Sequence, residues 1–429
     1  MELSFSHKAI QAISKQVFIL TLIAFLFSST ARAYSLLTHE AIVDVSWEKT
    51  IEPLLLERYP QATAEQLLEA HSYAYGGAIM PDIGYSPFGS MIYTDFVHNV
   101  RTGDYISAML EEAGDLNELA FALGSLAHYT ADNYGHMLGT NAAVPLVYPK
   151  MKARFGKTVT YADDHKSHSR IEFAFDVLQT ARGNYATKAY HDFIGFNISR
   201  TLVRKAFYRT YGLDVNDVFG NMAVAISTFR WTIKFLLPNI VRTAWAKKKD
   251  ELKKVGPDPG SRRFSYRMKN RTYYHEFGKD HQKAGILPTV LAVIVPILPK
   301  MGPLSKLRFK APSPEIEKLF IKSFDSTLVN FDRAVEAFHN GNTQLVNRTL
   351  DTGHPTVYGD YSIADKNYQD FLMMLYKGKF EHLNPPIKSN LMAFYAAHPK
   401  PLNKKERLNW KEISAALMML DQTRQQVNN

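Results

Sequence analysis

The stretch from Leu116 to His136 reads LNELAFALGSLAHYTADNYGH, and the rest of the chain is organised around it. Apolar residues recur in it at steps of three and four, at Leu116, Leu119, Ala120, Leu123 and Ala127. This period predicts a helix with one buried face. His128, Asp132 and His136 follow at successive steps of four, and each such step turns about 40° past a full circle on a helix. The three side chains therefore form one drifting stripe of ligand types that Zn²⁺ takes, although two exposed histidines at a polar helix end fit the same pattern.

The remainder of the sequence also predicts helices. Thr63 and Gln66 have the spacing of a capping box, and Ser167–Arg182 places its apolar residues on one side. A loop rich in glycine and proline lies between Gly76 and Gly89. The first 250 residues contain no convincing alternating strand pattern. The predicted fold class is therefore all-α, a multi-helix domain followed by a mostly helical C-terminal extension.

Composition narrows the functional classes. The chain of 429 residues is 46% hydrophobic and 12% aromatic, which predicts a sizeable core and excludes a disordered protein. Its formal net charge of +10 favours acidic partners such as phosphate esters, anionic lipid surfaces or nucleic acid. The chain has no cysteine, so any metal must be held by His, Asp, Glu or backbone atoms.

The N-terminal sequence has the pattern of a signal peptide. The apolar run Val17–Phe27 has the length of a signal core and is too short for a confident membrane span. Ala31-Arg32-Ala33 matches a small-x-small cleavage site. We expect cleavage between Ala33 and Tyr34 and export of the mature protein, which would be periplasmic or secreted; an uncleaved anchor is the alternative.

The sequence predicts four parts: a signal peptide over residues 1–33, a helical domain over 34–246, a basic linker with an apolar segment over 247–311, and a helical region over 312–429. Within the third part, Ile286–Leu298 is the most apolar piece of the mature chain and is interrupted by prolines. A core helix or packed hairpin fits this segment. The alternative is peripheral contact with an anionic membrane, because basic side chains flank it at Lys300, Lys306 and Arg308.

Other metal-type residues precede and follow the central stripe. His39 lies near the predicted mature N-terminus, Asp82 lies in the glycine-rich loop, and His98 occurs in YTDFVHNV. His168 and Glu172 stand four residues apart, so they share a helix face.

Taken in order, these residues carry a family resemblance. The start YSLLTH, the loop aspartate, His98, His128-x-x-x-Asp132 and His168-x-x-x-Glu172 resemble the zinc-dependent phospholipase C and S1/P1 nuclease superfamily, over about residues 34–176. The resemblance implies an all-α fold that holds up to three zinc ions in a cleft and hydrolyses phosphodiesters with a metal-activated water.

The resemblance also implies a role for each residue. One zinc would be held by Asp82, His98 and His128, with Asp82 also acting as general base. Asp132 would bridge this ion to a second, which the amine and carbonyl of Tyr34 and the side chain of His39 would chelate. The third ion would be held by His136, His168 and Glu172.

Three features differ from the usual family pattern. His136 follows the bridging aspartate by four residues where the family usually has six, so His165 is an alternative ligand. Tyr34 replaces the usual tryptophan, which matters little if only backbone atoms bind. Tyr85 stands where the nuclease branch has an arginine, which favours the phospholipase-like branch. Tyr85 and Phe96 are candidate head-group contacts, because aromatic faces suit a quaternary ammonium; they also fit an ordinary core.

Three functions follow from this pattern. The first is a secreted zinc-dependent phosphodiesterase that acts on phospholipid head groups. The second is a zinc-dependent single-strand nuclease of the same fold. The third is a non-enzymatic, metal-stabilised protein that binds membranes. The basic linker has few interleaved aromatic residues, which makes nucleic acid the less favoured partner.

Overall fold

The computed structural model describes residues 36–182, 184–185, 196–252, 254–255, 308–396 and 404–423. Tyr34, the predicted signal peptide and the apolar segment Ile286–Leu298 lie outside these described residues. Predictions about them therefore stay predictions.

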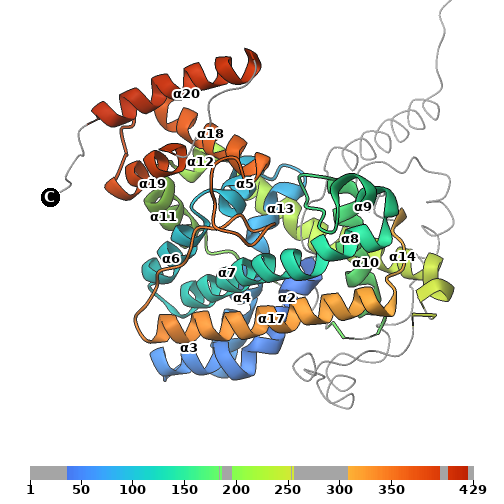
Figure 1. Cartoon of the computed structure of the whole chain (residues 1–429). Coiled ribbons are helices and arrows are strands. Elements are labelled where there is room, and N and C mark those ends of the chain that lie inside the picture. Colours follow the sequence, from blue (N-terminus) through green and yellow to red (C-terminus); the bar gives the residue numbers. More distant parts are fainter. Residues whose placement is uncertain are drawn as a thin grey trace, which may run out of the picture.

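The described part of the chain is built of helices, which confirms the predicted all-α fold (Figure 1). Its regular elements before the gap at residue 256 are α2 (Leu36–Ser46), η1 (Trp47–Ile51), α3 (Glu52–Arg58), α4 (Ala64–Ile79), η2 (Met80–Tyr85), α5 (Met91–Asn99), α6 (Thr102–Glu112), α7 (Leu116–Gly135), η3 (His136–Thr140), α8 (Asn141–Val147), α9 (Pro149–Phe155), α10 (His165–Ala181), α11 (Arg200–Tyr211), α12 (Val215–Val218), α13 (Met222–Trp231), η5 (Thr232–Leu236) and α14 (Leu237–Leu252). Those after it are α17 (Pro314–His339), α18 (Ser362–Lys377), α19 (Pro385–Ala396) and α20 (Lys404–Gln422).

Helix α7 is the predicted organising helix, and it lies at the centre of the packing. Asp115 caps its N-terminus by accepting a hydrogen bond from the Glu118 backbone N–H at 2.8 Å. Helix α4 packs against one face of α7 at very close range, because a methyl group added to Gly124 would lie 1.9 Å from the carbonyl oxygen of Ala74. Helix α17 runs along α7 on another side (Figure 1).

Helix α7 changes its geometry where the metal-type stripe ends. The regular helix stops at Gly135, and a short π-helical segment, η3, begins at His136. A π-helical turn inserts an extra residue into the hydrogen-bond pattern, and such turns are frequent at functional sites. Segment η3 leads directly into α8, which begins at Asn141.

The C-terminal region makes extensive contact with the earlier helices. Residues 340–361, which we call the crossing segment, run from α17 to α18 over α5, α6 and α7. The backbone N–H of Leu350 donates to the carbonyl of His98 at 3.0 Å. The hydroxyl of Tyr129 donates to the carbonyl of Val346 at 2.6 Å. A side chain on Gly103 would collide with this segment, since its Cβ would lie 2.4 Å from the carbonyl oxygen of Leu345.

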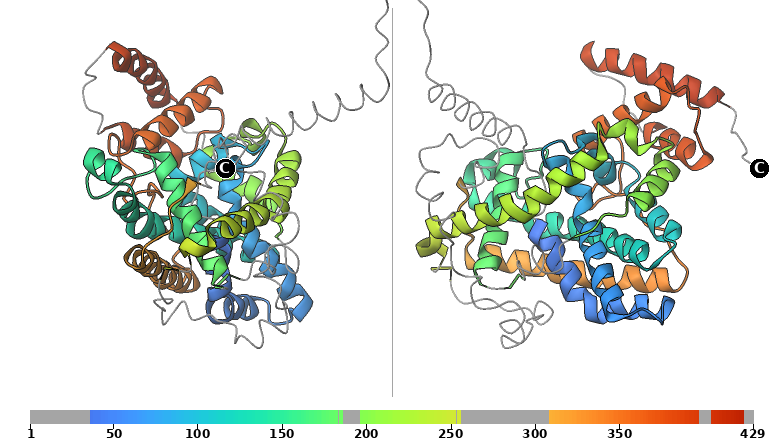
Figure 2. Two further views of the ribbon diagram at one scale, coloured as in Figure 1. Left: turned by 90° about the vertical axis from the view of Figure 1, so that its right-hand side faces the viewer. Right: turned by 180° about the vertical axis from the view of Figure 1, so that it is seen from behind.

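Two observations bear on the predicted domain boundaries. The boundary after residue 246 falls inside α14. Helices α18, α19 and α20 gather at the end of the molecule away from α14, as the front and rear views show (Figures 1 and 2). None of the helices in the described ranges combines the length and apolar composition that a membrane span requires.

Candidate metal centre

Five of the predicted ligand residues meet in one buried cluster, which we call the deep cluster. Its members come from four elements brought together around the C-terminal half of α7: His39 from α2, Asp82 from η2, His98 from α5, and His128 and Asp132 from α7. His39 and Asp132 are completely buried, and the side chain of His98 is 13% exposed. Burial of this many ionisable groups together is costly unless charges or a metal compensate for it.

Asp132 is the centre of the deep cluster. Its Oδ2 lies 3.3 Å from Nε2 of both His98 and His128. Its Oδ1 lies 3.4 Å from Nε2 of His39 and 3.6 Å from Nε2 of His136. The two oxygens of one carboxylate therefore face two different sets of histidines.

Asp82 closes the deep cluster from the side of the glycine-rich loop. Its Oδ1 lies 3.5 Å from Nε2 of His98, and its Oδ2 lies 3.9 Å from Nε2 of His39. The short 3-10 helix η2 holds it, and the backbone N–H of Gly84 fixes that turn by donating to Oγ1 of Thr94 at 2.9 Å. Burial raises the pKa of Asp82, and His98 and His128 oppose this rise.

Two histidines of the deep cluster are held in a fixed orientation. Nδ1 of His98 donates to the carbonyl of Thr94 at 2.7 Å, and Nδ1 of His128 donates to the carbonyl of Ala78 at 2.8 Å. Because a carbonyl only accepts, each Nδ1 carries the hydrogen and each Nε2 is directed into the cluster. This is the usual arrangement of a metal-binding histidine.

A second group of side chains lies beside the deep cluster, and we call it the open cluster because it borders a pocket. It contains His136, His168, Glu172 and Asp351. Oε1 of Glu172 lies 3.3 Å from Nε2 of His136 and 2.9 Å from Nε2 of His168. His136, and not the alternative His165, lies in this cluster; His165 is exposed on the first turn of α10.

The clusters have the donor set and the unmet polar groups of a metal site. Among the described residues, neither carboxylate oxygen of Asp82, Asp132 or Glu172 accepts a hydrogen bond, although all are buried. Three groups of ligand atoms each lie within 4.8 Å of one another: His39, His128 and Asp132; Asp82, His98 and His128; and His136, His168 and Asp351. Histidine and carboxylate ligands in this density suit Zn²⁺, so the residues fit the ion that the sequence predicts.

Burial and neighbouring charges shift the pKa values of Asp132 and His39. Burial alone would raise the pKa of Asp132, but the nearby His128 and His136 hold it well below its usual range. Burial and the neighbouring His128 lower the pKa of His39. His39 is therefore neutral at pH 7 and Asp132 is ionised, which are the states in which both groups bind a metal.

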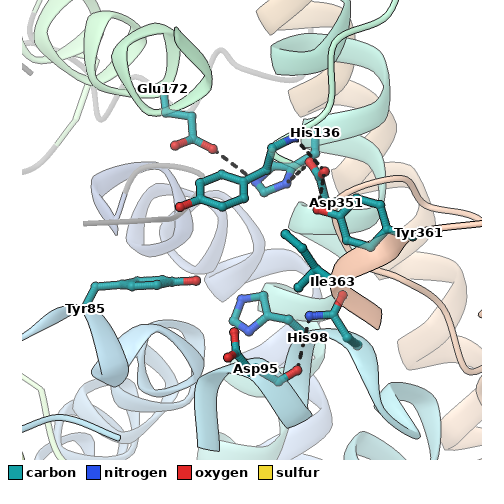
Figure 3. Close-up of a pocket in the computed structure, with 10 residues that line it drawn as sticks. Tyr85, Asp95, His98, His136, Glu172, Asp351, Tyr361 and Ile363 are labelled. Carbon is teal, nitrogen blue, oxygen red and sulfur yellow. Dashed lines mark hydrogen bonds and ion pairs between the residues drawn. The ribbon is translucent and has the colours of Figure 1, made fainter. Parts of the chain in front are cut away.

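The pocket opens over the open cluster, with His98 of the deep cluster in its wall (Figure 3). Its empty volume is about 440 Å³, part of it open to solvent. It is lined by Tyr85, Asp95, His98, Asn99, His136, Tyr161, Glu172, Asp351, Tyr361 and Ile363. Tyr85 projects its hydroxyl toward the middle of the pocket, opposite Tyr361 (Figure 3).

Phe96 does not line the pocket, which corrects the expectation that it contacts a head group. The ring is 1% exposed and packs against Tyr211 and Phe371 at centroid distances of 5.6 Å. Asp95, His98 and Asn99 of the same helix α5 face the pocket instead. The helix therefore turns Phe96 into the core while its neighbours face the site.

Six residues of the pocket wall were not predicted from the sequence, namely Asp95, Asn99, Tyr161, Asp351, Tyr361 and Ile363, and the last three come from the C-terminal region. Asp351 and Tyr361 belong to the crossing segment, and Ile363 begins α18. Asp351 stands in the irregular sequence NRTLDTGHP, where no helical spacing connects it to another ligand type. Only the folded contact between the crossing segment and α7, α8 and α10 brings it to His136 and His168.

Comparison with known proteins gives one match. Residues 38–221 match a family model described as "Zinc dependent phospholipase C". No curated protein and no solved structure gives a match. The matched range contains the whole deep cluster together with His136, His168 and Glu172, whereas Asp351 and Tyr361 lie beyond its end.

Proposed function

Because residues 38–221 place this chain in the zinc-dependent phospholipase C family, as its sequence predicts, we propose that the protein hydrolyses the phosphodiester bond of phospholipid head groups. A phospholipase C-like hydrolase is the activity that this family implies. The observation that carries the proposal is the convergence of His and carboxylate ligands in two adjoining clusters beside one pocket. The family match alone would not require the ligands to be present, but here they meet at distances suitable for zinc.

We assign the deep cluster to two ions and the open cluster to a third. Asp132 is the proposed bridge, which its geometry supports: one oxygen faces His98 and His128, and the other faces His39. Asp82, His98 and His128 would hold the first ion, and His39 would share the second with the N-terminal residue. His136, His168 and Glu172 would hold the third. Bound zinc supplies a water of lowered pKa and positive charge that neutralises phosphoryl oxygens.

Asp82 is the proposed general base. Its side chain is completely buried, and both its oxygens face histidine nitrogens of the deep cluster. Burial raises its pKa, and a raised pKa brings a carboxylate closer to the value at which it accepts a proton efficiently near neutral pH.

The pocket favours a cationic head group. Tyr85, Tyr161 and Tyr361 contribute aromatic surface to it, and Asp95 adds a carboxylate. Aromatic faces and carboxylates both attract a quaternary ammonium, as in choline. We therefore expect phosphatidylcholine to be a better substrate than an anionic phospholipid.

The experiment compares two substrates with and without metal. Purified protein would be treated with a chelator, dialysed, and assayed on phosphatidylcholine vesicles and on single-stranded DNA before and after zinc is restored. We expect release of phosphocholine only after zinc is added, and little cleavage of DNA. Full activity of the chelated protein without added metal would refute zinc dependence. Cleavage of DNA without hydrolysis of phospholipid would make the protein a nuclease of the same fold, and zinc binding without either activity would make it a binding protein.

Export and an N-terminal metal ligand form part of the same proposal. The sequence supports cleavage before Tyr34, and its freed amine and carbonyl would then share an ion with His39. An extra Met before Tyr34 would move the amine one residue away and break the five-membered chelate. We expect this extended protein to bind less zinc and to turn over more slowly than the correctly processed one. Equal zinc content and equal turnover would remove Tyr34 from the ligand set.

Peripheral contact with anionic membranes is proposed from the sequence of Ile286–Leu298 and its basic flanks alone. Basic residues near an anionic surface contribute about 1 kcal/mol each. The mature protein should therefore sediment with anionic liposomes more than with neutral ones at low salt. Equal binding to both would assign the segment to the core.

A further inference from the structure

Asp351 approaches the open cluster from outside the matched family segment. Its Oδ1 lies 3.3 Å from Nδ1 of His136 and 3.8 Å from Nε2 of His168. The side chain is 10% exposed and borders the same pocket as Glu172 (Figure 3). The crossing segment thus places the carboxylate of Asp351 close to the two histidines proposed for the third ion.

The other atoms of Asp351 are held firmly by hydrogen bonds. Its Oδ2 accepts from the backbone N–H of Tyr161 at 2.9 Å and from the hydroxyl of Tyr361 at 2.8 Å. Its backbone carbonyl accepts from the side-chain amide of Asn141 at 2.7 Å. Among the described residues Oδ1 accepts no hydrogen bond, although its atom is buried. One oxygen is therefore anchored and the other is presented to the histidines.

The distances are those of a ligand set before a metal draws it together. Zinc ligands lie about 2.0–2.2 Å from the ion, so the donor atoms around a tetrahedral ion lie about 3.3 Å apart. One ligand atom from each of His136, His168 and Asp351 lies within 4.8 Å of the others. Oε1 of Glu172 lies 2.9 Å from the same Nε2 of His168. Glu172 faces Nε2 of His136 and Asp351 faces Nδ1, so the His136 ring must turn to bring these donors to one ion.

We infer that Asp351 is a ligand of the third metal ion, so that the C-terminal crossing segment completes a site which the family segment begins. This inference rests on the proposed function, since it assumes that the open cluster binds zinc. Two carboxylates, Glu172 and Asp351, balance the charge of one Zn²⁺, whereas Glu172 alone leaves one positive charge in a largely buried place. A fourth protein ligand fills a tetrahedral shell, so this ion would join the crossing segment to η3 and α10.

The test removes the charge of Asp351 and follows the metal rather than turnover. Wild-type protein, Asp351→Asn and the matched control Asp360→Asn would be titrated with zinc in competition with a chelator. Asp360 is an exposed carboxylate of the same crossing segment. We expect Asp351→Asn to weaken the zinc of one site at least tenfold, while the remaining sites and the control stay unchanged.

A second measurement separates a ligand from a residue that only orients His136. Each protein would be loaded with saturating Co²⁺, whose visible absorption depends on the atoms that bind it. A ligand role predicts a changed spectrum for Asp351→Asn and an unchanged one for Tyr361→Phe, which keeps the carboxylate and removes one of its hydrogen bonds. An unchanged spectrum with weaker binding would reduce Asp351 to a positioning residue and overturn the inference.

The two proposals fail in different ways. If wild-type protein binds no stoichiometric zinc, the proposed function fails together with this inference. If wild-type protein binds zinc and hydrolyses phospholipid, but Asp351→Asn has the same zinc affinity and Co²⁺ spectrum, only the inference fails. If Asp351→Asn folds poorly, its metal-free form will have a lower melting temperature than metal-free wild-type protein. The zinc affinity of Asp351→Glu, which restores the carboxylate, and the Co²⁺ spectrum of Tyr361→Phe then test the inference in its place.

Discussion

The deep and open clusters are built in different ways, although they share α7. Every side chain of the deep cluster comes from the matched family segment, and backbone carbonyls orient two of its histidines: Thr94 of the same helix orients His98, and Ala78 of α4 orients His128. The open cluster takes three side chains from that segment and its fourth, Asp351, from the distant crossing segment. The deep cluster is therefore fixed by the helical core itself, whereas the open cluster depends on how the C-terminal region docks. The following predictions test this difference.

The largest effect is expected at Asp132, the residue that faces both sets of histidines. Asp132→Asn removes the charge that two ions of the deep cluster would share, so we expect it to lose more zinc than His136→Ala, which touches one ion of the open cluster. Activity on phosphatidylcholine should fall by a factor of about 10³ or more in Asp132→Asn, because a bridging ligand supports both ions that act on the phosphate.

Zinc content per protein, measured by atomic emission on dialysed samples, checks this order. The melting temperature of the chelated variants controls for misfolding. If both variants lose the same amount of zinc, Asp132 is not a bridge, and the proposed division of the ligands between the two clusters is wrong.

The same contrast explains what sequence reasoning can and cannot predict. The stripe of His128, Asp132 and His136 is visible because the period of a helix places residues four apart on one face. The approach of His39, Asp82 and His98 to that stripe followed from the family resemblance, and the structure brings them to it. Asp351 had no such signal, since only tertiary packing joins an irregular segment to a helix far away in sequence.

Single aromatic residues were harder to predict than ligands. Tyr85 and Phe96 are similar residues near the same ligands, yet one lines the pocket and the other lies in the core. Tyr85 ends the separate element η2, whereas the rotation of α5 directs His98 into the site and Phe96 towards Tyr211. A pattern of residue types does not fix the rotation of a helix about its axis closely enough to show which of two neighbouring positions faces the site.

A second prediction compares the packing that supports each cluster. Gly124→Ala would place a methyl group 1.9 Å from the Ala74 carbonyl oxygen, between α7, which carries His128 and Asp132, and α4, whose Ala78 carbonyl orients His128. Gly103→Ala would place one 2.4 Å from the Leu345 carbonyl in the crossing segment. We expect Gly124→Ala to lower the free energy of unfolding by about 3 kcal/mol, and Gly103→Ala by about 1 kcal/mol, because a loop yields more easily than a packed helix.

Chemical denaturation of the chelated proteins measures both values. Gly220→Ala is the matched control, because an added methyl group there meets no atom within 4 Å among the described residues. Gly103→Ala should also weaken one zinc ion, through displacement of the crossing segment, whereas Gly124→Ala should not act on one ion selectively. Equal destabilisation by the two variants would mean that the crossing segment is packed as rigidly as the helical core.

The smallest effect is expected at Tyr85, in the wall of the pocket. The residue is half-buried, and its hydroxyl projects into the pocket opposite Tyr361 (Figure 3). Tyr85→Ala removes one aromatic face from a cationic head group, an interaction that contributes about 0.5–1 kcal/mol at an exposed site. We expect a rise of a few-fold in KM for phosphatidylcholine, with an unchanged kcat and an unchanged melting temperature.

Phe96→Leu is the matched comparison. Because the Phe96 ring is buried against Tyr211 and Phe371, this substitution should lower the free energy of unfolding by about 1 kcal/mol and leave KM unchanged. Steady-state kinetics on vesicles and thermal melts of both variants test the pair, and a changed KM in Phe96→Leu with no change in Tyr85→Ala would place the head group on the other side of α5.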